Sequence, residues 1–304
     1  MAPEVPPRQL AIGYASALAT VVIWAGFILL ARLGGKSGLT GWDIVALRLG
    51  TAAVILLPFS LKLPAGTWRD GRLWTLAMVG GVLFLALVYT AFTMAPAAHG
   101  GILLPGMQPF LVTALAWWML GARPPRQRLL ALTPIALGVA CVAWPVVSGL
   151  HSGPSTLAGD ALLLSASIAW ATYSVLVKKW AYDPWLLTRF LALASTLVYM
   201  PFYLWLAPKG LDQVPTSMLV LQALYQGIGP TIIAMVLFLK AVSILGAERT
   251  GALVALVPVL AGLGAVPLLD EPLTPWLVAG LVLVSTGAWL ASRPVRSPPA
   301  RLTG

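Results

Sequence analysis

Ten runs of mostly apolar residues, each about as long as a bilayer is thick, follow one another along this sequence. They lie near residues 10–33, 42–60, 73–94, 99–120, 127–147, 158–178, 184–206, 217–242, 246–268 and 274–292. A helix needs about 20 such residues to cross the hydrocarbon core of a membrane. We therefore predict an all-α integral membrane protein with ten transmembrane helices and no soluble domain. The first run is long enough to span and lacks a clear small-residue cleavage site, so we expect it to be retained.

The composition leaves little material for a water-facing surface. Of 304 residues, 59% are hydrophobic and only 9% are charged, whereas a soluble domain carries roughly 25% charged residues. The net charge of +10 would suggest nucleic acid in a soluble protein, but the basic residues lie almost entirely between the apolar runs. We therefore expect a surrounding lipid bilayer and no nucleic-acid partner. The single cysteine, Cys141, excludes an internal disulfide.

Lysine and arginine are distributed unevenly between the two sets of loops. One set holds Arg8, Lys62, Arg69, Arg72, Arg123, Arg126, Arg128, Lys178, Lys179, Arg249, Arg293, Arg296 and Arg301. The other set holds only Arg32, Lys36 and Lys209. Because basic loops favour the cytoplasmic side, we predict that both termini are cytoplasmic, which requires an even number of spans. The expected location is the cell membrane, and the inner membrane if the source is bacterial.

The sequence also repeats itself. Residues of the two halves match in order as Trp24 with Trp170, Arg32 with Lys178, Arg48 with Arg189, Gly80 with Gly229, Pro109 with Pro258 and Gly138 with Gly287. We predict two five-helix repeats, residues 1–150 and 151–304, within one membrane domain. Five is odd, so the second repeat enters the membrane from the opposite side, as in many secondary transporters. The loop after the ninth run accordingly carries Asp270 and Glu271, where its counterpart carries arginines.

Over nearly its whole length the sequence resembles the ten-helix exporters of the drug/metabolite transporter superfamily. The resemblance rests on Trp24-Ala25-Gly26, Arg48 and Pro109 in the first half, and on Ala241, Gly246-Ala247, Pro258, Glu271, Gly280 and Gly287 in the second. The first half departs from it, with Gly121-Ala122 where the second has Asp270-Glu271. The resemblance implies two inverted helix bundles around a central cavity, working by alternating access. The aromatic-rich, nearly uncharged interior is most similar to exporters of aromatic and other apolar amino acids.

Motifs for chemistry are missing from the sequence. Gly35-Lys36-Ser37 resembles the end of a P-loop, but the upstream glycine is replaced by Leu30. His99 and His151 are far apart and have no Cys or carboxylate neighbours at metal-ligand spacing. We therefore expect no metal, no cofactor and no catalytic residues. An intramembrane enzyme stays as a distant alternative.

Aromatic and neutral polar residues lie near mid-membrane in several runs. We predict that these residues bind the substrate: Trp24, Tyr89, Gln108, Trp170, Tyr173, Tyr225 and Gln226. Tryptophan and tyrosine offer broad apolar faces with one hydrogen-bonding tip each, which suits a cavity wall. The alternative interpretation is that they only pack helices together. Arg48 and Arg189 are interpreted as shallow arginines that reach the membrane surface, although cavity roles stay open for both.

Helix kinks and gating are expected from a second set of residues. Pro109 and Pro258 stand at matching places and each removes a backbone hydrogen bond, and Pro105-Gly106 and Gly229-Pro230 add further breaks. Broken helices at equivalent places in two repeats point to a transport site, although simple packing is the alternative. His99 and Glu248 occupy equivalent helix starts. His99 could line the outer entrance, and Glu248 could act as a gate or as a helix cap.

No Asp or Glu lies deep in any run, which argues against a proton-coupled exporter of cationic drugs. We predict a secondary transporter that exports a small neutral or zwitterionic metabolite, such as an apolar or aromatic amino acid, without obligate coupling to protons or sodium. A broad-range drug or metabolite exporter is the alternative. The oligomeric state stays open, and a monomer is compatible with the sequence.

Overall fold

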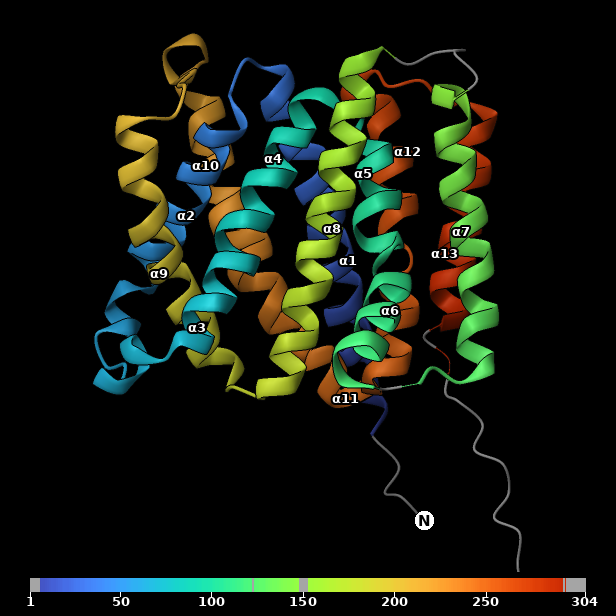
Figure 1. Ribbon diagram of the computed structural model, residues 1–304, viewed down its shortest axis with the longest axis horizontal. Coiled ribbons are helices and arrows are strands. Elements are labelled where there is room, and N and C mark those ends of the chain that lie inside the picture. Colours follow the sequence, from blue (N-terminus) through green and yellow to red (C-terminus); the bar gives the residue numbers. More distant parts are fainter. Residues whose placement is uncertain (1–5, 122, 148–152, 292, 294–304) are drawn as a thin grey trace, which may run out of the picture.

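The computed structural model describes residues 6–121, 123–147, 153–291 and 293, and every regular element among them is a helix. The long helices stand side by side in one bundle (Figure 1). Eight of the described helices are long and apolar enough to cross a membrane, and two shorter apolar helices, Leu129–Val142 and Pro275–Ala291, stand beside them. The all-helical membrane fold predicted from the apolar runs is confirmed.

The first half contains five of these spans. They are α1 (Pro7–Lys36); α2 (Gly41–Ser60); α3 (Gly71–Leu76), η2 (Ala77–Leu83) and α4 (Phe84–Met94) in one span; α5 (Ala97–Gly101), η3 (Ile102–Gly106) and α6 (Gln108–Leu120) in the next; and α7 (Arg126–Val147). The short η1 (Ala65–Arg69) joins the second span to the third. The turn between the third and fourth spans needs only Ala95 and Pro96.

The second half repeats this order. Its elements are α8 (Pro154–Trp180), α9 (Pro184–Trp205), η4 (Leu211–Gln213), α10 (Thr216–Ile228), η5 (Gly229–Ile233), α11 (Ala234–Val254), α12 (Val257–Leu269) and α13 (Pro275–Ala291). α10, η5 and most of α11 form one span, which ends at Gly246, where φ is +83°. The last residues of α11 and the whole of α12 form the next span, Arg249–Leu269.

Local signals in the sequence account for several helix ends. Thr40 and Asp43 form a capping box at the start of α2, each side chain bonding the other residue's backbone N–H. The two fourth spans end alike: Gly121 caps α6 with φ +67° and Asp270 caps α12 with φ +54°. This left-handed conformation is common just after a helix. Its recurrence supports the alignment of the two halves.

The two halves are packed into each other. α1 lies against α11 and α12, α2 against α9 and α10, α4 against α8, and α7 against α13. Glycines allow the last pair to approach closely, because a Cβ atom at Gly138 would lie 2.8 Å from the Gly280 carbonyl oxygen. Small residues serve helix packing in membranes in this way.

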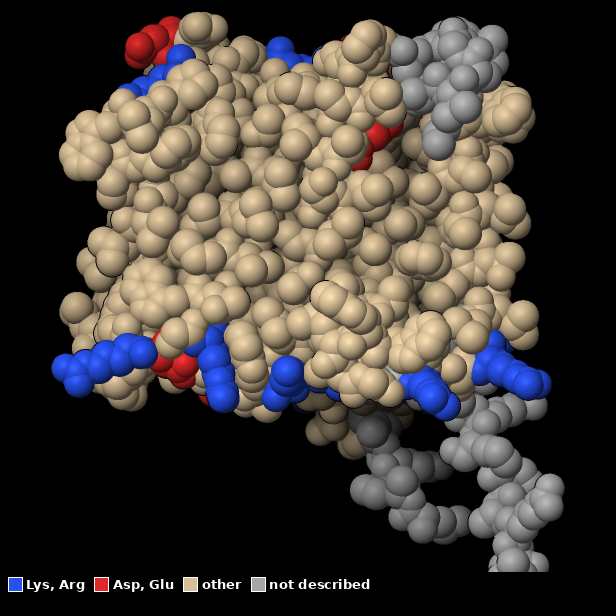
Figure 2. All heavy atoms as spheres, in the orientation of Figure 1, with Lys and Arg blue, Asp and Glu red and all other residues tan. Residues whose placement is uncertain are grey.

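Charge marks the two ends of the bundle. In Figure 2 the charged side chains lie along the upper and lower edges, and a broad uncharged band separates them. Large apolar residues are exposed on the outside of the helices, among them Val54, Trp118 and Leu130, as expected where lipid replaces water. α1 begins at the lower edge of Figure 1, and we call this end the N-terminal face and the opposite end the far face.

Candidate functional site

A cavity of about 100 Å³ lies between the two halves. Its wall is formed by α2, η2 and α4 of the first half and by α8, α9, η5 and α11 of the second. The lining residues are Arg48, Leu49, Ala52, Gly80, Gly81, Phe84, Leu85, Trp170, Tyr173, Thr188, Leu191, Ala192, Ser195, Pro230, Thr231 and Met235. Most of this wall is apolar, and its polar groups are few, as is typical of small-molecule sites.

Three aromatic rings form one side of the cavity. The ring centroids of Phe84 and Trp170 lie 4.8 Å apart, and those of Trp170 and Tyr173 lie 5.0 Å apart. Gly80 makes room for this arrangement, because a Cβ atom there would lie only 2.5 Å from the Tyr173 ring. The rings are tilted by 42° and 35° to one another, and together they form an apolar surface that carries the indole N–H and the tyrosine hydroxyl.

Arg48 supplies positive charge to the cavity. Its Nη1 donates a 2.9 Å hydrogen bond to the Tyr89 hydroxyl, and its guanidinium lies 5.4 Å from the centroid of the Phe27 ring. Tyr89 in turn donates to Gln226 Oε1 at 2.9 Å, and Gln226 Nε2 donates to the Phe27 carbonyl at 3.3 Å. In the described part of the chain no carboxylate forms an ion pair with Arg48. The cavity therefore holds a cation without an acidic partner.

The sequence interpretation of Arg48 as a surface-seeking arginine does not match this geometry. Arg48 lies seven residues after the start of α2, about 10 Å of helical rise from that end. Its side chain turns toward Tyr89 inside the bundle. Arg189, its partner in the repeat, is also half-buried, but it donates to the Phe59 carbonyl near the end of α2 at 2.7 Å and lies over the Trp185 ring. The signal that could have identified Arg48 is its place inside a span, where a charge is costly.

Stretches of π-helix border the cavity in both halves. η2 contributes Gly80 and Gly81 to its wall, and η5 contributes Pro230 and Thr231. The two stretches overlap in the repeat alignment, in which Gly80 matches Gly229. A π-helical turn changes the spacing of backbone carbonyls and occurs often at functional sites.

Four of the seven predicted binding residues lie at this site. Trp170 and Tyr173 line the cavity, and Tyr89 and Gln226 form the polar chain behind Arg48. The other three face neighbouring helices: the Trp24 ring packs on Phe238 at 5.4 Å, Tyr225 donates to the Ile23 carbonyl at 3.2 Å, and Gln108 donates to the Ser167 carbonyl at 3.3 Å. The structure therefore does not bring Trp24, Tyr225 or Gln108 to the cavity.

The two prolines predicted to kink helices stand at matching breaks. Pro109 is the second residue of α6 and Pro258 the second residue of α12. The residue before each helix, Met107 and Leu256, has ψ of −14°. A proline in a first helical turn removes no hydrogen bond, because that N–H has no partner within the helix. Their role in gating stays a prediction.

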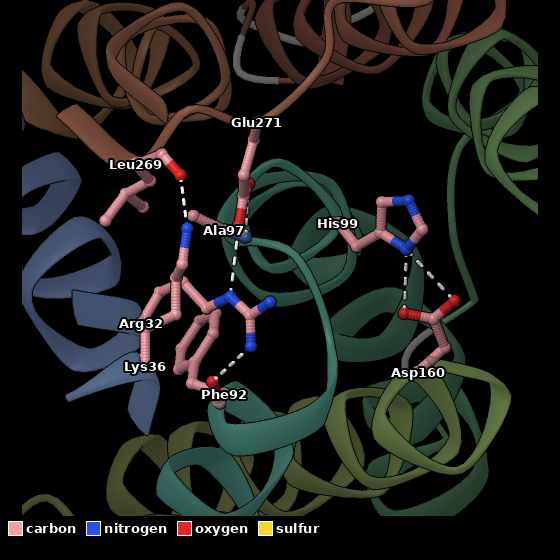
Figure 3. A network of polar contacts seen from close by, with 8 residues as sticks. All are labelled: Arg32, Lys36, Phe92, Ala97, His99, Asp160, Leu269 and Glu271. Atoms are coloured by element: carbon pink, nitrogen blue, oxygen red, sulfur yellow. Dashed lines mark hydrogen bonds and ion pairs between the residues drawn. The ribbon is translucent and has the colours of Figure 1, made fainter. Parts of the chain in front are cut away.

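A polar network lies at the far face (Figure 3). Arg32 Nε lies 3.0 Å from Glu271 Oε1, and Arg32 Nη1 donates to the Phe92 carbonyl at 2.9 Å. Glu271 also accepts a 2.9 Å hydrogen bond from the Ala97 backbone N–H. Lys36 donates to the carbonyl of Leu269 at the end of α12. Sequence reasoning did not anticipate this network.

His99 lies beside the network, where its Nδ1 is 2.9 Å from Asp160 Oδ1 (Figure 3). Glu248, its counterpart in the repeat, has a side chain outside the described residues, and so does His151. Among the described residues, no three His, Cys, Asp or Glu side chains come close enough to hold a metal ion.

Comparison with known proteins gives a consistent picture. The EamA-like transporter family matches the chain twice, over residues 11–144 and 157–293. An uncharacterized transporter from Archaeoglobus fulgidus is 26% identical over 285 residues, which cover 90% of this chain and 94% of that protein. A solved structure described only as the crystal structure of a protein is similar with a TM-score of 0.61 at 20% identity, covering 93% of this chain and 97% of that one. That likeness indicates a shared fold.

Proposed function

The chain belongs to the EamA-like transporter family, and we propose that it exports amino acids with apolar or aromatic side chains. The observation that carries the proposal is Arg48, a cation without an acidic partner among the described residues, in a cavity that is also lined by three aromatic rings. A substrate that complements both features has a negative group and an apolar body. A zwitterionic amino acid also adds no net charge to a membrane-embedded site.

The substrate can be placed by matching its groups to the wall. Its carboxylate would take the free donors of the Arg48 guanidinium, whose planar fork fits two carboxylate oxygens. Its side chain would lie against Phe84, Trp170 and Tyr173. Its ammonium group would need acceptors, which the hydroxyl of Thr231 and the carbonyls along η2 and η5 can provide.

Alternating access follows from the position of the cavity between two inverted halves. Rocking of one half against the other would expose the site to each face in turn. We place both termini in the cytoplasm on the basis of the basic loops. Export from a cell that accumulates the amino acid then requires no other driving force. The acidic side chains Asp43, Asp160 and Glu271 lie toward the far face and not on the cavity wall, which is consistent with transport uncoupled to protons or sodium.

The test is uptake into proteoliposomes with no ion gradient imposed. We expect labelled phenylalanine and leucine to enter these proteoliposomes much faster than empty liposomes, and excess phenethylamine, which lacks the carboxylate, to compete with their uptake only weakly. Liposomes that contain the Arg48→Gln variant are the matched control. Robust movement of cationic dyes with no amino-acid uptake would favour a broad-range exporter and contradict the proposal.

A further inference from the structure

The far-face network joins the two halves of the protein at three points. Arg32 of α1 reaches Glu271, which follows α12, and Lys36 of α1 reaches the last turn of α12. His99 of α5 reaches Asp160 of α8. Both contacts between a basic and an acidic side chain found among the described residues therefore lie at the same face, and both link the first half to the second. Contacts of this kind must break if the halves separate there.

The Arg32–Glu271 pair is well protected from solvent. The two side chains are 16% and 10% exposed, and Glu271 is tied in addition to the α5 backbone through Ala97 N. A charge in this position is stable only while its partner stays in place, because a buried charge left unpaired is costly. The pair therefore favours the arrangement in which the far face is closed.

An aromatic plug fills the space between this network and the cavity. It consists of Phe27, Tyr89 and Phe92, of which Tyr89 and Phe92 are fully buried. The Phe27 ring meets Tyr89 edge-on at 5.8 Å and Phe92 at 6.5 Å. Arg48 lies over the cavity side of the plug, and Arg32 bonds the Phe92 carbonyl on its far-face side. One continuous set of contacts thus joins the far-face network to the cavity.

The N-terminal face lacks the equivalent charges. Asp270 and Gly121 are matched helix caps, so the residue after each cap matches as well: Glu271 in one half and Ala122 in the other. Arg32 corresponds to Lys178, which is exposed. Ala122 lies outside the described residues, but its side chain carries no carboxylate that could bind Lys178. Contacts between the halves do occur at this face, such as the Tyr182–Asp70 hydrogen bond, but no ion pair between described side chains does.

We propose that Arg32, Lys36 and Glu271, together with the aromatic plug, form a gate at the far face, and that the missing counterpart makes the protein rest with its cavity open toward the N-terminal face. The inference rests on the transport role of the family, but not on the identity of the substrate. If the termini are cytoplasmic, the resting protein faces the cytoplasm and is ready to load a substrate for export.

The experiment measures from which face the cavity can be reached. A single cysteine replaces Thr231, which lines the cavity, in a Cys141→Ala background. A membrane-impermeant thiol reagent is applied to spheroplasts and to inverted vesicles, so that each face is tested separately. We expect labelling from the N-terminal face and little from the far face. Equal labelling from both faces would overturn the proposed resting state.

Gate variants are then compared in the same background. Glu271→Gln and Arg32→Gln should each raise far-face labelling about tenfold or more, as loss of one charge-assisted hydrogen bond allows. The matched control is Asp212→Asn, which removes a charge from the exposed η4 loop of the same face and should change nothing. If far-face labelling is unchanged in both gate variants, and both variants are monodisperse, the Arg32–Glu271 pair only stabilises the fold and does not act as a gate.

General loosening of the bundle must be distinguished from opening of the gate. Val142→Cys in the same Cys141→Ala background provides this control, because Val142 is buried between α7 and α13, away from the cavity. We expect it to stay unlabelled in both gate variants. Far-face labelling at this position as well would show that the variants simply destabilise the fold, and would contradict the gate. None of these measurements requires a substrate, so a failure of amino-acid uptake would leave their outcome intact.

Discussion

Arg48 and Arg189 are repeat partners with different surroundings. Arg48 bonds Tyr89 beside the cavity, whereas Arg189 caps a carbonyl at the exposed end of α2. The same residue type thus serves two purposes, although both arginines are half-buried: Arg48 bonds a side chain next to the cavity, and Arg189 bonds a backbone carbonyl and lies over the Trp185 ring. The two arginines form a natural pair for mutagenesis.

Replacing Arg48 with glutamine should impair transport far more than the same change at Arg189. Loss of a hydrogen bond to a charged group costs about 1.5–3 kcal/mol, or roughly a 10- to 150-fold loss of affinity. We expect this loss in the KM for phenylalanine uptake, with little change in the weak competition by phenethylamine. Arg48→Lys keeps the charge but loses the planar fork, and should fall between the wild type and Arg48→Gln. Equal effects at both arginines would exclude a carboxylate-binding role for Arg48.

The two tryptophans matched in the repeat give a second comparison. Trp170 lines the cavity, whereas Trp24 packs on Phe238 between α1 and α11. Trp170→Ala should reduce the rate of phenylalanine uptake about tenfold or more. The reason is that the ring of the substrate loses its contact with the indole of Trp170 and the apolar area buried by that contact. Trp24→Ala should mainly lower the yield of folded protein. If Trp24→Ala instead loses more transport activity per folded molecule than Trp170→Ala, the substrate would bind beside Trp24 and not in the described cavity.

At the scale of elements, the apolar runs predicted the spans well, because spanning length and hydropathy are fixed by the bilayer. The breaks expected at Pro105-Gly106 and Gly229-Pro230 coincide with η3 and η5. The side of each helix that faces the cavity could not be predicted. Lipid is as apolar as the protein core, so a membrane helix such as α1 has no polar face to set its rotation. For this reason the sequence could not predict which of Trp24 and Trp170 lines the cavity, or which residues Arg32 contacts.

Close contact between α7 and α13 should depend on glycine. A Cβ atom at Gly138 would lie 2.6 Å from Val284 Cγ2 and 2.8 Å from the Gly280 carbonyl oxygen. Gly138→Ala should therefore destabilise the protein by about 1–3 kcal/mol, the usual cost of overpacking. Thermal unfolding in detergent measures this. Gly71→Ala is the matched control, since a Cβ atom there would meet nothing within 4 Å; an equal fall in Tm would point to a general effect of the substitution.

The loops of the two halves are joined at the N-terminal face by a hydrogen bond from the Tyr182 hydroxyl to Asp70. This bond lowers the pKa of Asp70 below its usual value of 3.8. A lowered pKa means that the bond stabilises the fold above that value, and that the gain is lost as the pH falls through the lowered pKa. Tyr182→Phe should therefore lower Tm slightly at pH 7, and the difference from the wild type should shrink as the pH falls below 3.8. A difference in Tm that persists at low pH would assign the effect to packing.

At the scale of the whole molecule, charge and repeat direction together define the two faces. Lys and Arg side chains line the lower edge of the bundle in Figure 2, which is the N-terminal face. The far face carries fewer bases, and two of them, Arg32 and Lys36, are engaged with Glu271 and the end of α12. Free positive charge is therefore concentrated at one face. That is the face which a charge-based insertion rule keeps in the cytoplasm.

The orientation is tested with a reporter that is active only in the cytoplasm. Fused after Gly304, it should be active, because ten spans return the chain to the side on which it began. Fused after Gln213 in η4 at the far face, the same reporter should be inactive, and one that works only outside the cytoplasm should be active there. This pair of fusions tests the number of spans as well as their direction, since seven spans precede η4. An inactive cytoplasmic reporter after Gly304 would reverse the assignment of the two faces, and with it the direction in which the resting cavity opens.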